Sequence, residues 1–192
     1  MLILASASPR RRELLTQAGF EFQVHPAHIP EDLLPNEDPI AYVTRLARQK
    51  AEAVYESLVS RNLGTEAIVL GADTTVTVDD HILGKPESSQ DAARMLRLLS
   101  GRTHRVITGI ALKSASQTQV AHEVTTVPFL PVTEQQIAEY IATGEPSDKA
   151  GAYAIQGRAA RWIPRIEGCY FNVVGLPIAR TIDLLAEAQE AP

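Results

Sequence analysis

The sequence has little of several features that mark specialised classes of protein. It contains a single cysteine, Cys169, so no disulfide can form within the chain, as is usual in the reducing cytoplasm. Its longest apolar stretches, residues 1–5 and 67–72, are far shorter than the ~20 residues that cross a bilayer. The first stretch has arginines after it and none before it, the reverse of a signal peptide. We therefore expect a cytoplasmic protein that does not enter a membrane.

An excess of basic residues is also missing. The 192 residues include 18 Lys+Arg against 23 Asp+Glu, a net charge of −5, whereas binding to the phosphates of a nucleic acid needs a positive surface. The five histidines show neither a helical i, i+4 pair nor cysteine partners at zinc spacing, and no P-loop motif is present. These absences argue against a nucleic-acid partner, a zinc site and a P-loop NTPase.

The length fits one domain spanning residues 1–192, and the sequence is compatible with either a monomer or a homodimer. Apolar runs alternate with helix-like stretches. The expected strands are 2–5, 20–25, 67–73, a hairpin of 75–78 with 82–83, 104–112 and 119–130; the expected helices are 9–18, 39–58, 89–100, 133–141 and one from residue 177. This order predicts an α/β fold with a mixed, twisted sheet flanked by helices.

The start of the first predicted helix carries an unusual cluster of cations. Ser8 is the expected N-cap, and Arg10, Arg11 and Arg12 follow in the first turn, where the positive end of the helix dipole disfavours them. A bound anion would remove this conflict, because backbone N–H groups, hydroxyls and guanidinium groups together form a phosphate site. The alternative is that the arginines extend into solvent and pair with carboxylates such as Glu13. We expect Arg12 to be merely exposed.

Two further segments place ionisable residues in apolar surroundings. Lys50 lies within the apolar stripe of the helix at 39–58, where it either snorkels to a nearby edge or reaches into a cleft; the pattern alone favours snorkelling. The apolar run 67–72 ends at Asp73, and ligands of open α/β sheets bind beyond the carboxyl ends of strands. The alternative for Asp73 is a turn that its own side chain stabilises. Lys85, on a loop, is a weak signal by itself.

Residues 144–175 are rich in glycine, which allows a backbone to approach a ligand closely or merely to turn. Within this segment Gln156 carries both a donor and an acceptor, as needed to contact the edge of a base. The stretch from Asn172 leads to a helix start and is a second candidate phosphate region. Trp162 is expected in a core, and no motif ties a base to Cys169.

Six motifs, in order along nearly the whole chain, resemble those of the Maf family. They are Ser6–Arg11, Arg45–Ala51, Leu70–Thr74, Gly84–Pro86, Asp148–Gly157 and Asn172–Pro177. The resemblance implies a fold like that of inosine triphosphate pyrophosphatase, with a cleft between two lobes. It also implies a cytoplasmic house-cleaning enzyme that converts nucleoside triphosphates to monophosphate and pyrophosphate with a divalent metal, Mg²⁺ or Mn²⁺. The segment 152–157 is similar to the branch that acts on dTTP and UTP.

The same resemblance assigns roles to individual residues. It implies Asp73 as general base, Glu31 and Asp73 at the metal, Arg10, Lys50 and Lys85 around the polyphosphate, and Arg11, Thr74 and Gln156 in substrate choice. Ser8, at the helix start, is a candidate substrate contact from the phosphate-site argument above. Ala7 departs from the glycine common in the family, but this change removes no functional group. The alternatives are a related pyrophosphatase that prefers 7-methyl-GTP or damaged purine nucleotides, and a non-catalytic nucleotide-binding regulator of division.

Overall fold

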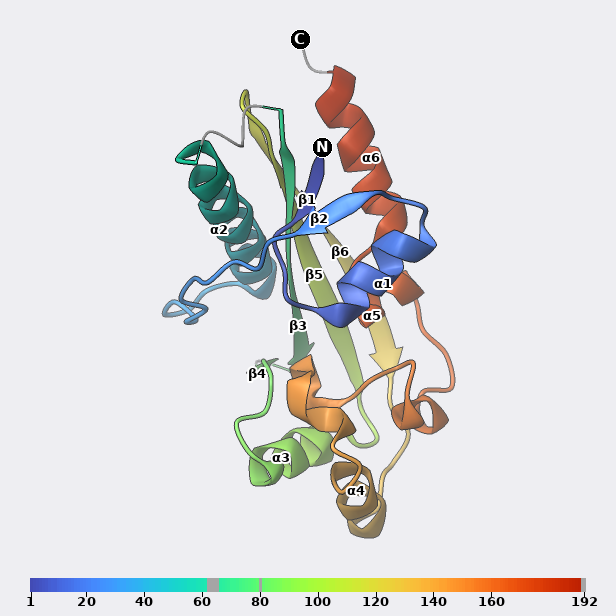
Figure 1. Ribbon diagram of the computed structural model, residues 1–192. Coiled ribbons are helices and arrows are strands. Elements are labelled where there is room, and N and C mark those ends of the chain that lie inside the picture. Colours follow the sequence, from blue (N-terminus) through green and yellow to red (C-terminus); the bar gives the residue numbers. More distant parts are fainter. Residues whose placement is uncertain (62–65, 80, 191–192) are drawn as a thin grey trace. The chain divides into compact units, whose positions relative to one another are not determined.

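The computed structural model describes residues 1–61, 66–79 and 81–190, and it confirms the mixed α/β class (Figure 1). The elements are β1 (Leu2–Leu4), α1 (Pro9–Gln17), β2 (Phe22–Val24), α2 (Pro39–Val59), β3 (Ile68–Val78), β4 (His81–Leu83), α3 (Ser89–Leu99), β5 (Thr103–Lys113), β6 (Thr118–Pro128), α4 (Glu134–Ile141), η1 (Glu145–Asp148), η2 (Ala150–Ala152), η3 (Arg158–Trp162), α5 (Tyr170–Val174) and α6 (Ile178–Glu190). Within these ranges, no helix is both long enough and apolar enough to span a bilayer.

The strands form one six-stranded sheet in the order β2-β1-β3-β5-β6, with β4 paired to β3. β1 pairs in parallel with both β2 and β3, and its last residue, Leu4, lies opposite Val24 and Leu70. β4 is antiparallel to β3, with Val76 opposite Leu83. The parallel and antiparallel pairs together confirm the predicted mixed sheet.

β3 differs from its prediction in one respect that matters for the site. The expected strand at 67–73 does not end at Asp73 but continues to Val78, and its final part forms the predicted hairpin with β4. The expected turn includes Asp79, whose φ of 49° lies in the left-handed region, while Asp80 lies outside the described residues. The interpretation of Asp73 as a turn residue is therefore wrong, because an extended strand runs through it.

Local start signals explain where the helices begin. The Asp38 carboxylate accepts hydrogen bonds from the N–H groups of Ile40 and Ala41, and α2 starts at the next residue, Pro39. Thr133 and Gln136 form the predicted capping box before α4, each side chain bonding the backbone N–H of the other. Both helix starts were predictable because each cap depends only on residues within one turn.

The chain divides into two compact units: unit 1 comprises residues 1–73, 108–123 and 175–192, and unit 2 comprises 74–107 and 124–174. Three of the boundaries between them lie within strands β3, β5 and β6. The organisation of residues 1–192 as a single domain, and a cleft between two lobes, remain predictions.

In unit 1, α2 packs on the sheet through small residues. In Figure 1 this helix lies on one side of β1 and β3, with α1 and α6 on the other. Gly71 of β3 contacts α2 so closely that a Cβ there would lie 2.1 Å from the carbonyl oxygen of Ala47, and a Cβ on Gly109 of β5 would lie 2.4 Å from that of Val43. The buried side chains of the helix therefore contact the strands directly, and Lys50 is among them.

The core of unit 2 is built around aromatic rings. His104, Phe129 and Tyr153 contact one another with ring centroids 5.3–5.8 Å apart, and Trp162 contacts Phe129 and Tyr140. Trp162 is 3% exposed, which confirms that it is a core residue. The edge-to-face arrangement that dominates the cluster is favourable for aromatic side chains.

Candidate functional site

Lys50 joins two carboxylates in unit 1. Its ammonium nitrogen lies 2.6 Å from Oδ1 of Asp73 and 2.7 Å from Oε1 of Glu31. Lys50 and Asp73 are 7% and 8% exposed, whereas the Glu31 side chain is half exposed. Snorkelling was therefore the wrong expectation for Lys50: its ammonium stays inside the unit, where it meets a charge from the neighbouring strand.

The position of Asp73 follows from the sheet. It lies in β3 three residues beyond Leu70, the last residue that pairs with β1, so its side chain comes just past the end of the parallel pairing. Burial raises the pKa of the Asp73 carboxyl above its usual value, and the charges of Lys50 and Arg11 oppose this shift. A buried carboxyl with a raised pKa is a good candidate for a general base.

Arg11 turns into unit 1 instead of extending from the helix start. Its Nε donates to the carbonyl oxygen of Gly175 at 2.8 Å, and its Nη1 donates to that of Ala72 at 2.9 Å and to Ser6 Oγ at 3.1 Å. Burial lowers the pKa of the guanidinium, and the nearby Asp73 charge opposes this effect. The guanidinium group thus links the start of α1, through the Ser6 side chain, to the backbone at Gly175 and at Ala72, and Ala72 is adjacent to Asp73.

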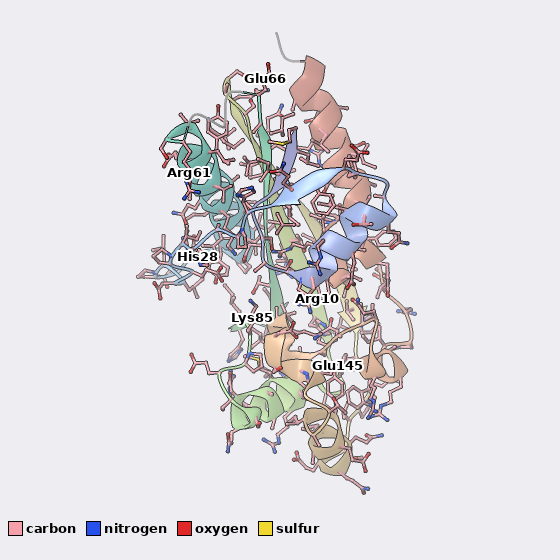
Figure 2. The ribbon with its side chains drawn as sticks, in the orientation of Figure 1. Arg10, His28, Arg61, Glu66, Lys85 and Glu145 are labelled. Atoms are coloured by element: carbon pink, nitrogen blue, oxygen red, sulfur yellow. The ribbon has the colours of Figure 1, made fainter. Side chains whose placement is uncertain are left out.

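The other residues at the start of α1 agree with the sequence prediction in position, but Ser8 does not cap the helix with its side chain. Ser8 is the N-cap residue and Pro9 follows it, but the Ser8 side chain makes no capping hydrogen bond, and its N–H donates to Ser6 Oγ at 3.2 Å. Arg12 is exposed as expected, and Arg10, which is partly exposed, lies in the first turn of the helix (Figure 2). The backbone N–H groups at the N-terminus of α1, together with Arg10, therefore remain a candidate anion site.

The loop that carries Glu31 is attached to α2 by contacts that sequence reasoning missed. The Tyr42 hydroxyl donates to the carbonyl oxygen of Glu31 at 2.9 Å, and Arg45 donates to that of Asp32 at 3.0 Å. Arg45 also forms a bidentate ion pair with Glu37, at 2.6 and 2.7 Å. Burial, followed by the nearby charges of Asp73 and Glu31, raises the pKa of Tyr42 to about 12. The sequence signal for this ion pair was the spacing of eight residues between Glu37, which precedes α2, and Arg45, which lies within it.

Three predicted site residues belong to unit 2. Thr74 follows Asp73 directly and is partly buried, Lys85 is exposed on the loop after β4 (Figure 2), and Gln156 is exposed on a turn. The loop of Lys85 is held by a hydrogen bond from the N–H of Gly151 to the carbonyl oxygen of Gly84, at 3.0 Å. The structure therefore brings Glu31, Lys50 and Asp73 into contact within unit 1 and places Lys85 and Gln156 on unit 2.

Several glycines of the segment 144–175 approach protein atoms, which supports the structural interpretation for them. A Cβ on Gly151, whose φ is +68°, would lie 2.9 Å from the Val76 side chain, and one on Gly168 would lie 2.9 Å from Thr125 Oγ1. Asn172 is buried, and its amide donates to the carbonyl oxygen of Val106 and to Thr125 Oγ1. The Asn172 side chain is thus part of the interior of unit 2.

The donor set of unit 1 suits a divalent cation. Among the described residues, no three His, Cys, Asp or Glu side chains form a cluster of metal-site geometry. Glu31 and Asp73, however, both contact one ammonium group, so the three side chains carry one negative charge in excess. Carboxylate oxygens are the ligands that Mg²⁺ prefers, usually one or two of them together with substrate phosphates and water. The two carboxylates therefore fit such a metal.

Comparisons with known proteins agree with the motifs. The sequence profile described as "Maf-like protein" matches residues 1–188. A protein of Koribacter versatilis named dTTP/UTP pyrophosphatase is 52% identical over 187 residues, covering 97% of this chain and 94% of the relative. Proteins of the same name from Moorella thermoacetica and Bacillus pumilus are 52% and 47% identical, covering 96% of this chain and 93% and 94% of the relatives.

Proposed function

Because the chain belongs to the Maf-like protein family, we propose that it is a nucleoside triphosphate pyrophosphatase that hydrolyses dTTP and UTP to the monophosphate and pyrophosphate. The observation that carries this proposal is the buried contact of Asp73 with Lys50, which a half-exposed Glu31 completes. A carboxylate base, a second carboxylate and a cation suit phosphoryl hydrolysis, because its catalysis is mainly positioning and charge stabilisation. The names of relatives about 50% identical to the chain support the choice of dTTP and UTP.

In this proposal Asp73 accepts the proton of the water that attacks the α-phosphorus. Its burial shields the carboxylate from bulk water, and Lys50 keeps it in one orientation. Arg11 supports Asp73 indirectly, because its hydrogen bond to the carbonyl oxygen of Ala72 fixes the backbone next to Asp73. Thr74, the next residue of the same strand, joins Arg11 in substrate choice.

The cations assigned to the polyphosphate are Arg10, Lys50 and Lys85. Guanidinium and ammonium groups stabilise the charge on the β and γ phosphates, which leave together as pyrophosphate. Ser8 lies at the start of α1, where a helix N-terminus and an uncapped first turn favour a phosphate oxygen. Gln156, exposed on its turn, can contact the base through both a donor and an acceptor.

The metal assigned to the site is Mg²⁺ or Mn²⁺, held by Glu31 and Asp73 with the phosphates of the substrate. Such an ion, when bound, would supply Lewis-acid stabilisation of the negative charge on the phosphates. Lys50 balances the two carboxylates before substrate arrives, which keeps them side by side. We assign the enzyme to the cytoplasm, where nucleoside triphosphates are made and used.

The proposal is tested by following ¹⁸O from labelled water during hydrolysis of UTP with Mg²⁺ or Mn²⁺. Attack at the α-phosphorus places the label in UMP and leaves pyrophosphate unlabelled. Asp73→Asn should lower kcat by roughly 10²–10⁴-fold, the usual contribution of a general base, while the protein stays folded. Asp79→Asn is a matched control, since Asp79 is exposed, pairs with Arg102 and has a φ of 49° that asparagine tolerates.

Each alternative gives a different result in the same assay. A non-catalytic binding protein would bind dTTP and release no pyrophosphate. A relative with another preference would hydrolyse 7-methyl-GTP or an oxidised purine nucleotide faster than UTP. Undiminished activity of Asp73→Asn, or label in the pyrophosphate, would refute the proposed reaction.

A further inference from the structure

Two residues of unit 2, Tyr140 and Glu145, hold both ends of the turn that carries Gln156. The fully buried Tyr140 hydroxyl donates to Glu145 Oε1 at 2.6 Å and accepts from the N–H of Ala154 at 3.1 Å. The Glu145 carboxylate accepts from the N–H of Arg158 at 3.1 Å and 3.2 Å through its two oxygens. The pair, called the turn clamp below, therefore fixes the backbone two residues before and two residues after Gln156.

Gly157 allows the carboxylate to come this close. A Cβ on Gly157 would lie 2.2 Å from Glu145 Oε1, and the φ of Gly157, −106°, is one that any residue adopts. The glycine is therefore needed for space and not for its backbone conformation. Its N–H closes the turn by donating to the carbonyl oxygen of Ala154 at 3.1 Å. Glu145, labelled in Figure 2, thus lies directly against the turn, while the Gln156 side chain is exposed.

We propose that Tyr140 and Glu145 are positioning residues that orient Gln156 toward the base of the substrate, so that the turn clamp sets the preference of the enzyme for uracil and thymine over cytosine. This inference rests on the proposed function, in which Gln156 contacts the base. Because the backbone on both sides of Gln156 is fixed, its amide approaches the base from a restricted direction. An amide that presents its donor to the carbonyl edge of uracil meets the amino group of cytosine unfavourably. An amide on a loose turn adapts to either base and discriminates less.

The test compares kcat/KM for UTP and CTP, two substrates with the same ribose and triphosphate. Tyr140→Phe and Glu145→Ala should each lower the UTP:CTP ratio at least fivefold, mainly by raising KM for UTP. Tyr153→Phe is the control for the first variant, because it removes a buried hydroxyl of the same unit that contacts His104 at 2.8 Å. Glu139→Ala is the control for the second, since that exposed carboxylate accepts only from Gln135 among the described contacts. Both controls should keep the wild-type ratio.

A double-mutant cycle separates positioning from general loss of stability. In a Gln156→Ala background, Tyr140→Phe should lower the ratio no further, because the clamp acts through Gln156. Glu145→Gln retains Oε1 as an acceptor and should restore most of the preference that Glu145→Ala loses. Because Glu145 is partly exposed, its variants test the clamp even where Tyr140→Phe does not fold.

Failure of the clamp and failure of the proposed function give different results. If the wild type releases no pyrophosphate from UTP, the assigned reaction is wrong. If Gln156→Ala keeps the wild-type UTP:CTP ratio, Gln156 does not contact the base as proposed. Either result also refutes the role of the turn clamp. If Gln156→Ala removes the preference while the folded Glu145→Ala variant retains it, the clamp alone is overturned.

Discussion

The substitution Arg11→Met tests whether this arginine mainly stabilises the fold of unit 1 or mainly contacts the substrate. The guanidinium group is buried and donates to the carbonyl oxygens of Gly175 and Ala72 and to Ser6 Oγ, at 2.8, 2.9 and 3.1 Å. Methionine keeps an unbranched chain that fills much of the same space, but it has no donor. The substitution therefore leaves two buried carbonyl oxygens without these hydrogen bonds.

The size of the effect follows from these contacts. A hydrogen bond from a charged donor contributes roughly 1.5–3 kcal/mol, so two of them set an upper range of roughly 3–6 kcal/mol. Removing the buried charge, whose desolvation lowers the pKa of Arg11, offsets part of this loss. We expect the free energy of unfolding to fall by about 2–4 kcal/mol. For a chain of 192 residues this corresponds to a decrease in Tm of roughly 5–15 °C.

Urea unfolding measured beside Arg12→Met provides the check. Arg12 is exposed on the same helical turn, and removing its charge from the positive end of the helix dipole should leave stability unchanged or raise it by roughly 0.3–1 kcal/mol. Arg11→Lys should lie between the wild type and Arg11→Met, because an ammonium keeps the charge but lacks the planar fork. Equal unfolding midpoints for Arg11→Met and Arg12→Met would show that the buried contacts do not stabilise the fold.

Two further predictions concern stability in each unit. In unit 2, burial lowers the pKa of His104 to about 4, whereas a histidine in the unfolded chain has a pKa near 6.5. The unfolded chain therefore binds a proton between these pH values that the native state does not bind. The free energy of unfolding should then fall by about 2 kcal/mol between pH 8 and pH 5. Urea midpoints across this range should show the loss in wild type and in the exposed His81→Gln but not in His104→Gln, and an unchanged slope in His104→Gln would contradict the assignment. In unit 1, Gly71→Ala should destabilise the protein by about 3 kcal/mol or more, because the new Cβ would lie 2.1 Å from the carbonyl oxygen of Ala47. The control is Gly84→Ala in unit 2, whose Cβ would meet no atom within 4 Å and should change stability by less than about 1 kcal/mol. Similar melting temperatures for the two glycine variants would contradict the packing of α2 on β3.

The helices of this protein were largely predictable because their ends depend on nearby residues. Asp38 with Pro39, and Thr133 with Gln136, form their caps within a single turn, and α2 and α4 begin where these signals lie. The short helices η1, η2, η3 and α5, which lie within the glycine-rich stretch 144–175, were not predicted. The strands were less well bounded: β3 continues past Asp73 because its pairing with β4 supports it, and that partner comes after a turn. Pairing between strands that are distant in the sequence has no short local motif that marks where a strand ends, whereas a helix cap is such a motif.

The site shows the same difference. The helical pattern placed Lys50 on the apolar face of α2, but it could not show that the opposite strand offers a carboxylate there. An inward lysine without a partner would snorkel, and this is why that expectation was wrong. The contacts of Tyr140 with Glu145 and of Tyr42 with the Glu31 carbonyl were not predicted either. Each contact joins a helix to a neighbouring segment whose path no helix or strand pattern fixes: Glu145 begins the short helix η1 after α4, and Glu31 lies in the loop before α2.

The sequence by itself determined the α/β class, the starts of the longer helices and, through six motifs, the family that the match over residues 1–188 confirms. Only the tertiary structure decided what the buried charged side chains do. It turned Arg11 inward to three acceptors and set Lys50 between Asp73 and Glu31. The physical reason is that a helix cap or an apolar period depends on neighbours within a few residues, whereas burying a charge requires a partner, and the chain brings that partner from far away in the sequence.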